Sequence, residues 1–328
     1  MNRSYVTLLS LLLSLFVHAS VSAQAKPVLA VLNKADNNLT FVDPMTMKVT
    51  AKIPVGDSPH EVVFSTDGKL AFVANYGAQT PGSTISVIDV ATAKELRRVD
   101  ISPLMRPHGL HFVGGKLYFT AETNRMIARY DPVANKVDWM MGTGQNGSHM
   151  VAVSADQKRI VTANIGSDNV TVFDLQNVPP APSKVTQIPV GKQPEAVDLS
   201  PDGKEVWTGL NAEGMVEIVD VAAGKSVAKL PIGGRPYRVR FTPDGKKVVL
   251  TMVPTKEILV IDAATRKEIK RLKVDGTPLG VAFSNDGSTI FVTVVEPHST
   301  LKIDLEKLEI TGKVETGTVP DGIAVWGM

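Results

Sequence analysis

Three histidines of this chain share one local sequence setting. His60 lies in SPHEVVF, His108 in RPHGLHF and His149 in GSHMVAV, and each comes directly before a run in which apolar residues alternate. Alternation of this kind is typical of a β-strand with one buried face. Imidazole binds several transition metals and titrates near neutral pH, so a fold that brings the three strand starts together would create a chemically capable site.

The equivalent position in the next stretch of this type, QPEAVDL, is Glu195. Three imidazoles and a carboxylate suit zinc, copper or iron, and the sequence contains no cysteine that could supply a thiolate ligand. We therefore predict a divalent transition metal held by His60, His108, His149 and Glu195. The alternatives stay open: direct binding of a small ligand or acid–base work without a metal, and a polar lining that only hydrogen-bonds water and neighbouring carbonyls.

A repeated turn indicates which elements carry these residues. The motifs SPDGK, TPDGK and SNDGS place Gly203, Gly245 and Gly287 at steps of 42 residues. Aspartate and glycine favour tight turns, and the β-branched runs between the turns favour strands. Four short strands within a period of roughly 40 residues are typical of one blade of a β-propeller.

Seven strand starts of this kind can be counted along the chain. Each is marked by a proline or its substitute, at Pro59, Pro107, Ser148, Pro194, Pro236, Pro278 and Pro320. The last segment, PDGIAVWGM, supplies one strand, while VLAVLN, LTFVD and KVTAKIPVG near the N-terminus match the other three strands of a repeat. We predict an all-β fold: one domain over residues 24–328, a seven-bladed β-propeller of four-stranded blades whose last blade is closed by strands from both ends.

In such a ring, the residue after each strand start should lie near the central channel at one mouth. These positions are His60, His108, His149, Glu195, Tyr237, Leu279 and Asp321. Glu61 directly follows His60, and we expect it to point away from the channel as part of the wall. His111 has the opposite strand phase to His108, and we expect it to pack between blades.

Other residues are candidates for the same mouth. Glu122, in YFTAETNRMIARYD, ends the second strand of its blade and can act as a general base or hold a metal-bound histidine in place. Arginine beside an aromatic can bind an anionic substrate, or it can neutralise nearby carboxylates. The predicted ligand-binding residues are Arg235, Tyr237, Arg238, Asp321, His298 and Tyr76.

Composition and the N-terminal segment bear on partners and location. The chain has 35 Lys and Arg against 33 Asp and Glu, so no strong field favours a nucleic acid. Residues 1–23 combine Arg3, a short apolar run and a small-residue cleavage site, the pattern of a signal peptide. We expect a periplasmic or secreted protein with no membrane span after cleavage, whose partner is a metal ion, a small molecule or an envelope protein.

The repeats resemble a known family. LAFVANYG, RIVTANIGSDNVTVFDL and IPVGKQPEAVDLSPDGK are similar to the YVTN β-propeller repeats of secreted and surface-layer proteins, and the segment around Glu122 resembles streptogramin lyases and SMP-30-like propellers. The resemblance implies a propeller and leaves activity open. The expected function is therefore an exported metal-binding propeller; the alternatives are a metal-dependent hydrolase or lyase, such as a lactonase, and an interaction scaffold of the cell envelope.

Overall fold

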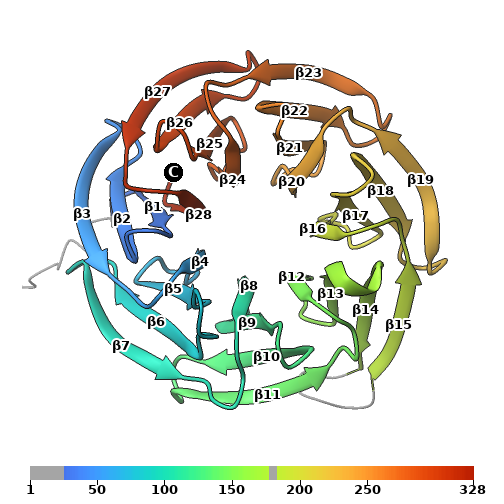
Figure 1. Ribbon diagram of the computed structural model, residues 1–328, viewed down its shortest axis with the longest axis horizontal. Coiled ribbons are helices and arrows are strands. Elements are labelled where there is room, and N and C mark those ends of the chain that lie inside the picture. Colours follow the sequence, from blue (N-terminus) through green and yellow to red (C-terminus); the bar gives the residue numbers. More distant parts are fainter. Residues whose placement is uncertain (1–25, 177–182) are drawn as a thin grey trace, which may run out of the picture.

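Seven four-stranded antiparallel sheets stand in a ring around a central channel in a computed structural model of the chain (Figure 1). The structure describes residues 26–176 and 183–328. The predicted signal peptide, residues 1–23, lies outside the described residues. Within these ranges, no helix has the length and hydrophobicity needed to cross a bilayer.

We number the blades by their innermost strands, starting with β4. Blade 1 consists of β4 (Pro59–Phe64), β5 (Leu70–Asn75), β6 (Thr84–Asp89) and β7 (Lys94–Asp100). Blade 2 consists of β8 (Pro107–Val113), β9 (Lys116–Ala121), β10 (Met126–Asp131) and β11 (Lys136–Gly142). Blade 3 consists of β12 (Ser148–Val153), β13 (Arg159–Asn164), β14 (Asn169–Leu175) and β15 (Ser183–Pro189), with a single 3-10 turn, η1 (Ile165–Ser167), after β13.

The remaining blades repeat this plan. Blade 4 consists of β16 (Pro194–Leu199), β17 (Glu205–Leu210), β18 (Met215–Asp220) and β19 (Lys225–Pro231). Blade 5 consists of β20 (Arg235–Phe241), β21 (Lys247–Val253), β22 (Glu257–Asp262) and β23 (Glu268–Lys273). Blade 6 consists of β24 (Pro278–Phe283), β25 (Thr289–Val294), β26 (Ser299–Asp304) and β27 (Glu309–Glu315).

Blade 7 joins the two ends of the chain, as predicted. Its strand order is β28 (Pro320–Trp326), β1 (Val28–Asn33), β2 (Asn38–Asp43) and β3 (Lys48–Pro54), and Ala30 pairs with Ala324. Because the innermost strand comes from the C-terminal segment and the outer three from the N-terminal segment, the ring closes through β-sheet pairing.

The space between blades is filled by apolar side chains of the middle strands. Phe72, Phe119 and Tyr130 are fully buried between blades 1 and 2, and Trp207 packs edge-on against Phe241 between blades 4 and 5. Side chains of this size bury about 150–250 Å² each and dominate core energetics. The packing holds each innermost strand at a set distance from its neighbours, which is what a site shared between blades requires.

Every innermost strand is irregular near its start. In blade 1, Pro59 of β4 pairs with Asn75 of β5, and the next pair is Val62 with Val73. Two residues of β4 therefore lie opposite a single residue of β5. Similar register shifts occur near the starts of β8, β12, β16, β20, β24 and β28. An extra residue interrupts the alternation of side chains. Positions one and two after the strand start can therefore both face the channel.

This irregularity makes the prediction for Glu61 wrong. Instead of pointing away from the channel, Glu61 of blade 1 contacts the guanidinium of Arg238 of blade 5, across the ring. The two residues occupy the same position, two after the strand start. In three other blades this position is glycine, and at Gly322 an added Cβ would lie 2.2 Å from the carbonyl oxygen of His60. The inner strands thus approach too closely there for a side chain.

Candidate functional site at the channel mouth

The three histidines of blades 1, 2 and 3 lie side by side at one mouth of the channel. The ring centroids of His60 and His108 are 5.0 Å apart, and those of His108 and His149 are 3.7 Å apart with a tilt of 34°. The structure therefore brings together the histidines that the sequence placed at one register.

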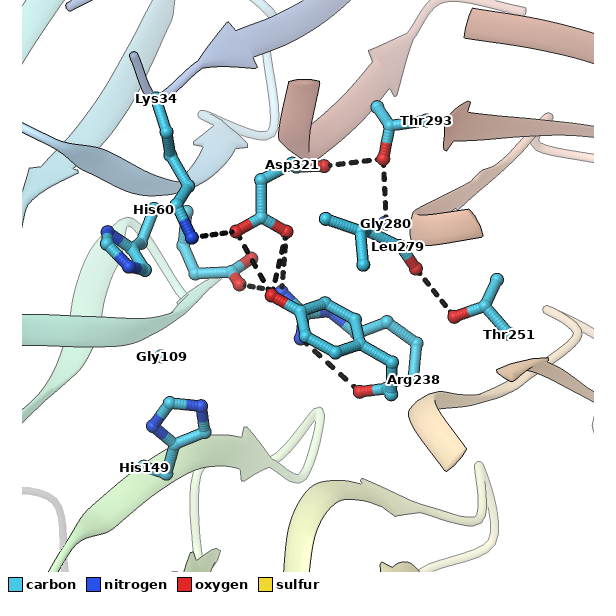
Figure 2. Close-up of polar contacts among 12 residues, drawn as sticks. Lys34, His60, Gly109, His149, Arg238, Thr251, Leu279, Gly280, Thr293 and Asp321 are labelled. Carbon is cyan, nitrogen blue, oxygen red and sulfur yellow. Dashed lines mark hydrogen bonds and ion pairs between the residues drawn. The ribbon is translucent and has the colours of Figure 1, made fainter. Parts of the chain in front are cut away.

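Threonines of the second strands hold the backbone of this ring of residues. The Thr120 hydroxyl accepts a hydrogen bond from the Gly109 amide (2.9 Å) and donates one to the carbonyl of His149 in the next blade (2.7 Å). Thr293 makes the same bridge between Gly280 and Asp321, as Figure 2 shows. A buried hydroxyl that satisfies two backbone groups links neighbouring blades. These links fix where the first channel-facing side chain of each blade begins.

Hydrogen bonds at Nδ1 set the tautomers of two of the histidines. His60 Nδ1 lies 2.8 Å from the carbonyl oxygen of Ser58, and His149 Nδ1 contacts the Glu122 carboxylate. Carbonyls and carboxylates only accept, so both Nδ1 atoms carry the proton and the lone pair is at Nε2. The His108 ring is 3% exposed, and its Nδ1 has no hydrogen-bond partner among the described residues.

Glu122 is engaged on both of its oxygens. His149 contacts Oε1, and the Tyr76 hydroxyl donates to Oε2 at 2.5 Å. The Tyr76 ring also packs against His60, with centroids 4.4 Å apart, and the Arg106 guanidinium lies 4.6 Å from that ring's centroid. A carboxylate held by two donors orients His149. The predicted alternative, a free general base, lacks an uncommitted oxygen in this arrangement.

Burial sets the protonation states of the cluster. It lowers the pKa of His60 to about 4, with a further contribution from the charge of Lys34, and it lowers the pKa of His108 well below its usual value. Burial alone would raise the pKa of Glu122, but hydrogen bonds from His149 and Tyr76 outweigh it and lower that pKa. Burial also raises the pKa of Tyr76 to about 12. At neutral pH, His60 and His108 are neutral and Glu122 is ionised.

Glu195, the predicted fourth ligand, lies on blade 4, where its Oε2 accepts a hydrogen bond from the Asn211 amide. Burial raises the pKa of this carboxyl group. Across the ranges that the structure describes, no group of three or more histidine, aspartate or glutamate side chains has the spacing of a metal site. The histidines are adjacent, with neighbouring rings tilted by 59° and 34°, and their nitrogens do not converge on one point.

On blades 5 and 7, three of the predicted ligand-binding residues interact with one another (Figure 2). Asp321 is fully buried, lies 3.2 Å from Lys34 Nζ and accepts the Tyr237 hydroxyl at 3.1 Å. Arg238 is 3.7 Å from Asp321 and 4.6 Å from the centroid of the Tyr237 ring. Although burial alone would raise the pKa of Asp321, Lys34 and Arg238 lower it. This arrangement corresponds to the neutralising role predicted as the alternative to substrate binding.

Of the other three predicted ligand-binding residues, Tyr76 contacts Glu122 and His60, and Arg235 and His298 make none of these contacts. Arg235 is exposed at the start of β20, and it forms no ion pair within the described part of the chain. His298 lies in the turn between β25 and β26, with its Nδ1 3.4 Å from the amide nitrogen of Val319. Their predicted roles stay predictions.

A second register supplies the partners of the first; sequence reasoning predicted Tyr76 and Glu122 one by one but missed Lys34, Asn211 and the register that all four share. Lys34, Tyr76, Glu122 and Asn211 each follow the last residue of the second strand of their blade. They contact Asp321, His60, His149 and Glu195, respectively. Aligning the repeats at the ends of the second strands would have identified all four together.

Comparisons with known proteins agree with this architecture. Similar solved structures include hydrazine synthase of Kuenenia stuttgartiensis, with 21% identity, a TM-score of 0.68, and coverage of 81% of this chain and 89% of that chain. A functionally unknown protein of Desulfotomaculum acetoxidans has 13% identity and a TM-score of 0.75, with coverage of 91% and 98%. The Cps50 (Swd1) propeller domain of Myceliophteria thermophila has 13% identity and a TM-score of 0.65, with coverage of 78% and 86%.

At these identities, the likeness shows the fold alone. The sequence matches no curated protein. The sequence model of the YNCE-like β-propeller family, in contrast, matches residues 9–150 and 116–288, which together span most of the chain. The chain therefore belongs to the YNCE-like β-propeller family.

Proposed function

We propose that the channel mouth binds one divalent transition metal ion, zinc, copper or iron, through His60, His108 and His149. One observation carries the proposal: the buried Nδ1 of His108 has no partner within the described residues, and it lies between two imidazoles whose Nδ1 atoms are occupied. A buried polar atom without a partner costs about 1–3 kcal/mol, so a ligand that satisfies it is favoured.

The surroundings of His60 and His149 support the same function. Histidines that bind metals generally donate their other ring nitrogen to a carbonyl or carboxylate, as Nδ1 of His60 does to Ser58 and Nδ1 of His149 to Glu122. Metal binding also requires neutral imidazole. Because the imidazole nitrogens do not converge on one point, the proposal requires rotation about side-chain bonds when the ion binds, and Glu195 is the candidate fourth ligand.

A binding role is favoured over a hydrolytic one because both oxygens of Glu122 already accept hydrogen bonds. Export, inferred from residues 1–23, is part of the same proposal and places the site outside the cytoplasm.

The test is calorimetric titration of zinc chloride and copper sulfate into untagged, chelator-treated protein. Wild type should bind one equivalent of at least one of these ions. Since loss of an outer partner alone weakens metal sites about 10–100-fold, His108→Gln should weaken binding at least that much. His111→Gln changes a histidine of the same strand, β8, outside the cluster and should bind like wild type. Equal binding by His108→Gln and wild type would contradict the proposal.

A further inference from the structure

The other end of the channel contains a cavity of about 450 Å³. Residues of the innermost strands of all seven blades line it. Most of these residues are apolar by type, but several, such as Val62 and Phe241, are packed between blades, so polar and apolar atoms share the surface that faces the cavity. Its mouth lies at the turns after these strands, next to Ser65, Pro243 and Trp326. Sites for small molecules commonly have volumes of about 300–1,000 Å³ and predominantly apolar walls with a few polar groups.

This cavity is separate from the histidine cluster. Glu61 lines its inner end, and Arg238, which is 4% exposed, contacts Glu61 from the opposite side of the ring. His60, His108 and His149 do not line the cavity. A molecule in the cavity would therefore be separated from the histidine mouth by a buried ion pair.

Apart from Glu61 and the turn residues at the mouth, three polar side chains line the cavity: His111, Asp198 and Arg240. Asp198 is already satisfied, because it accepts the amides of Leu199 (3.0 Å) and Phe241 (2.9 Å) and lies 3.5 Å from Arg240 Nε. The Arg240 side chain is 46% exposed, and it makes no hydrogen bond within the described ranges. The guanidinium thus keeps uncommitted donors at the cavity.

His111 is the second uncommitted group. It lines the cavity, and its ring makes no hydrogen bond within residues 26–176 and 183–328. Burial and the charge of Arg240 lower its pKa to about 4, so it is a neutral donor and acceptor near that guanidinium. Together, His111 and Arg240 provide polar recognition beside an apolar chamber.

We propose that this cavity is a second ligand site, which takes a small molecule with an apolar body and an acidic head group. The body lies among the aliphatic and phenylalanine side chains. The carboxylate or sulfonate head accepts hydrogen bonds from the fork of Arg240, a geometry that matches planar two-oxygen anions. His111 hydrogen-bonds a second polar atom of the ligand.

Fluorescence titration with 8-anilinonaphthalene-1-sulfonate tests this site, and N-phenyl-1-naphthylamine provides a similar apolar body without the charge. Wild type should bind the sulfonate saturably at one site, at least about 10-fold more tightly than the amine, as expected for a charge-assisted bond to a guanidinium with free donors. Arg240→Gln should remove that preference and leave amine binding unchanged. Arg240→Lys, which keeps the charge but loses the fork, should be intermediate.

Arg235→Gln is the matched control, because it removes an exposed arginine from the other end of the same strand, β20. It should bind the sulfonate like wild type, as should His108→Gln, which keeps this test independent of the metal proposal. Thermal melts and near-ultraviolet circular dichroism establish that each variant is folded. No saturable binding to folded wild type, no preference for the sulfonate, or equal effects of Arg240→Gln and Arg235→Gln would each overturn the proposal.

Discussion

The two ends of the channel are built from the same seven strands, yet their chemistry is opposite. At the histidine mouth, side chains at the starts of the innermost strands contact residues at the ends of the second strands, such as Tyr76 and Lys34. Nearly every charged group there has a close partner. The opposite cavity is lined by apolar side chains and a few polar ones, and Arg240 keeps free donors there. Chemistry in this fold therefore depends on depth along the inner strand: the bulged start carries a dense cluster of paired polar groups, and the regular remainder carries apolar side chains with isolated polar groups such as Asp198 and Arg240.

The ion pair of Glu61 and Arg238, which separates the two ends of the channel, should show the largest loss of stability on mutation. Burial raises the pKa of Glu61, but the guanidinium of Arg238 contacts its carboxylate directly and favours the ionised pair. Arg238→Met leaves Glu61 without its partner and Asp321 with one fewer cation, so unfolding free energy should fall by about 3–5 kcal/mol. Urea denaturation followed by circular dichroism measures the change.

The double variant Glu61→Gln with Arg238→Met is the control, and it should recover much of the lost stability because no unpaired charge stays buried. A loss below about 1 kcal/mol in the single variant would show that the pair contributes little.

His111 should make the cavity end sensitive to acid. Its folded-state pKa is about 4, below the ordinary value of 6.5, so the folded protein resists its protonation. The contribution to stability is complete above pH 6.5 and is lost as the pH falls toward 4, by at most about 3 kcal/mol. Urea midpoints of chelator-treated His111→Gln should therefore fall less than those of wild type between pH 7 and 4.

Between pH 7 and 8, the His111→Gln variant and wild type should keep a constant difference in stability. Parallel curves down to pH 4 would mean that His111 does not titrate with a lowered pKa.

Gly322 tests the close approach of strands beside His60. An added Cβ would meet the His60 carbonyl oxygen at 2.2 Å, so Gly322→Ala should cost about 1–3 kcal/mol by overpacking. At Gly142, at the end of β11, nothing lies within 4 Å of an added Cβ, and Gly142→Ala should be neutral or slightly stabilising. Thermal melts of the two variants give the comparison; equal melting temperatures would show that the backbone relaxes at Gly322.

The smallest effect on metal affinity is expected at Tyr76, which packs against the ring of His60 and donates a hydrogen bond to Glu122 but is not itself a proposed metal ligand. Tyr76→Phe keeps the contact with His60 but removes the hydrogen bond to Glu122. Zinc or copper affinity should fall by less than about 10-fold, while Glu122→Gln should cost about 10–100-fold. The same calorimetric titration orders the two variants, and an effect of Tyr76→Phe equal to that of His108→Gln would assign the phenol a direct role.

The sequence by itself determined the repeat and one register of the site. The turn motifs and the strand starts from Pro59 to Pro320 predicted seven blades and the closure of blade 7, because a two-residue alternation between fixed turns is a local property of the chain. The same alignment placed His60, His108 and His149 at one position, and their adjacency follows from the ring. Metal binding and export stay predictions.

The tertiary structure alone decided which side chains meet. The bulge near the start of each inner strand turned Glu61 into the channel, where it contacts Arg238, 177 residues away in the sequence. His111 also lines the cavity at the far end of the channel, a location that strand phase did not predict. Strand phase read from sequence assumes regular pairing, whereas the bulge depends on how two strands align and on how closely seven strands crowd around one axis. Those are properties of the closed ring, which no single repeat contains.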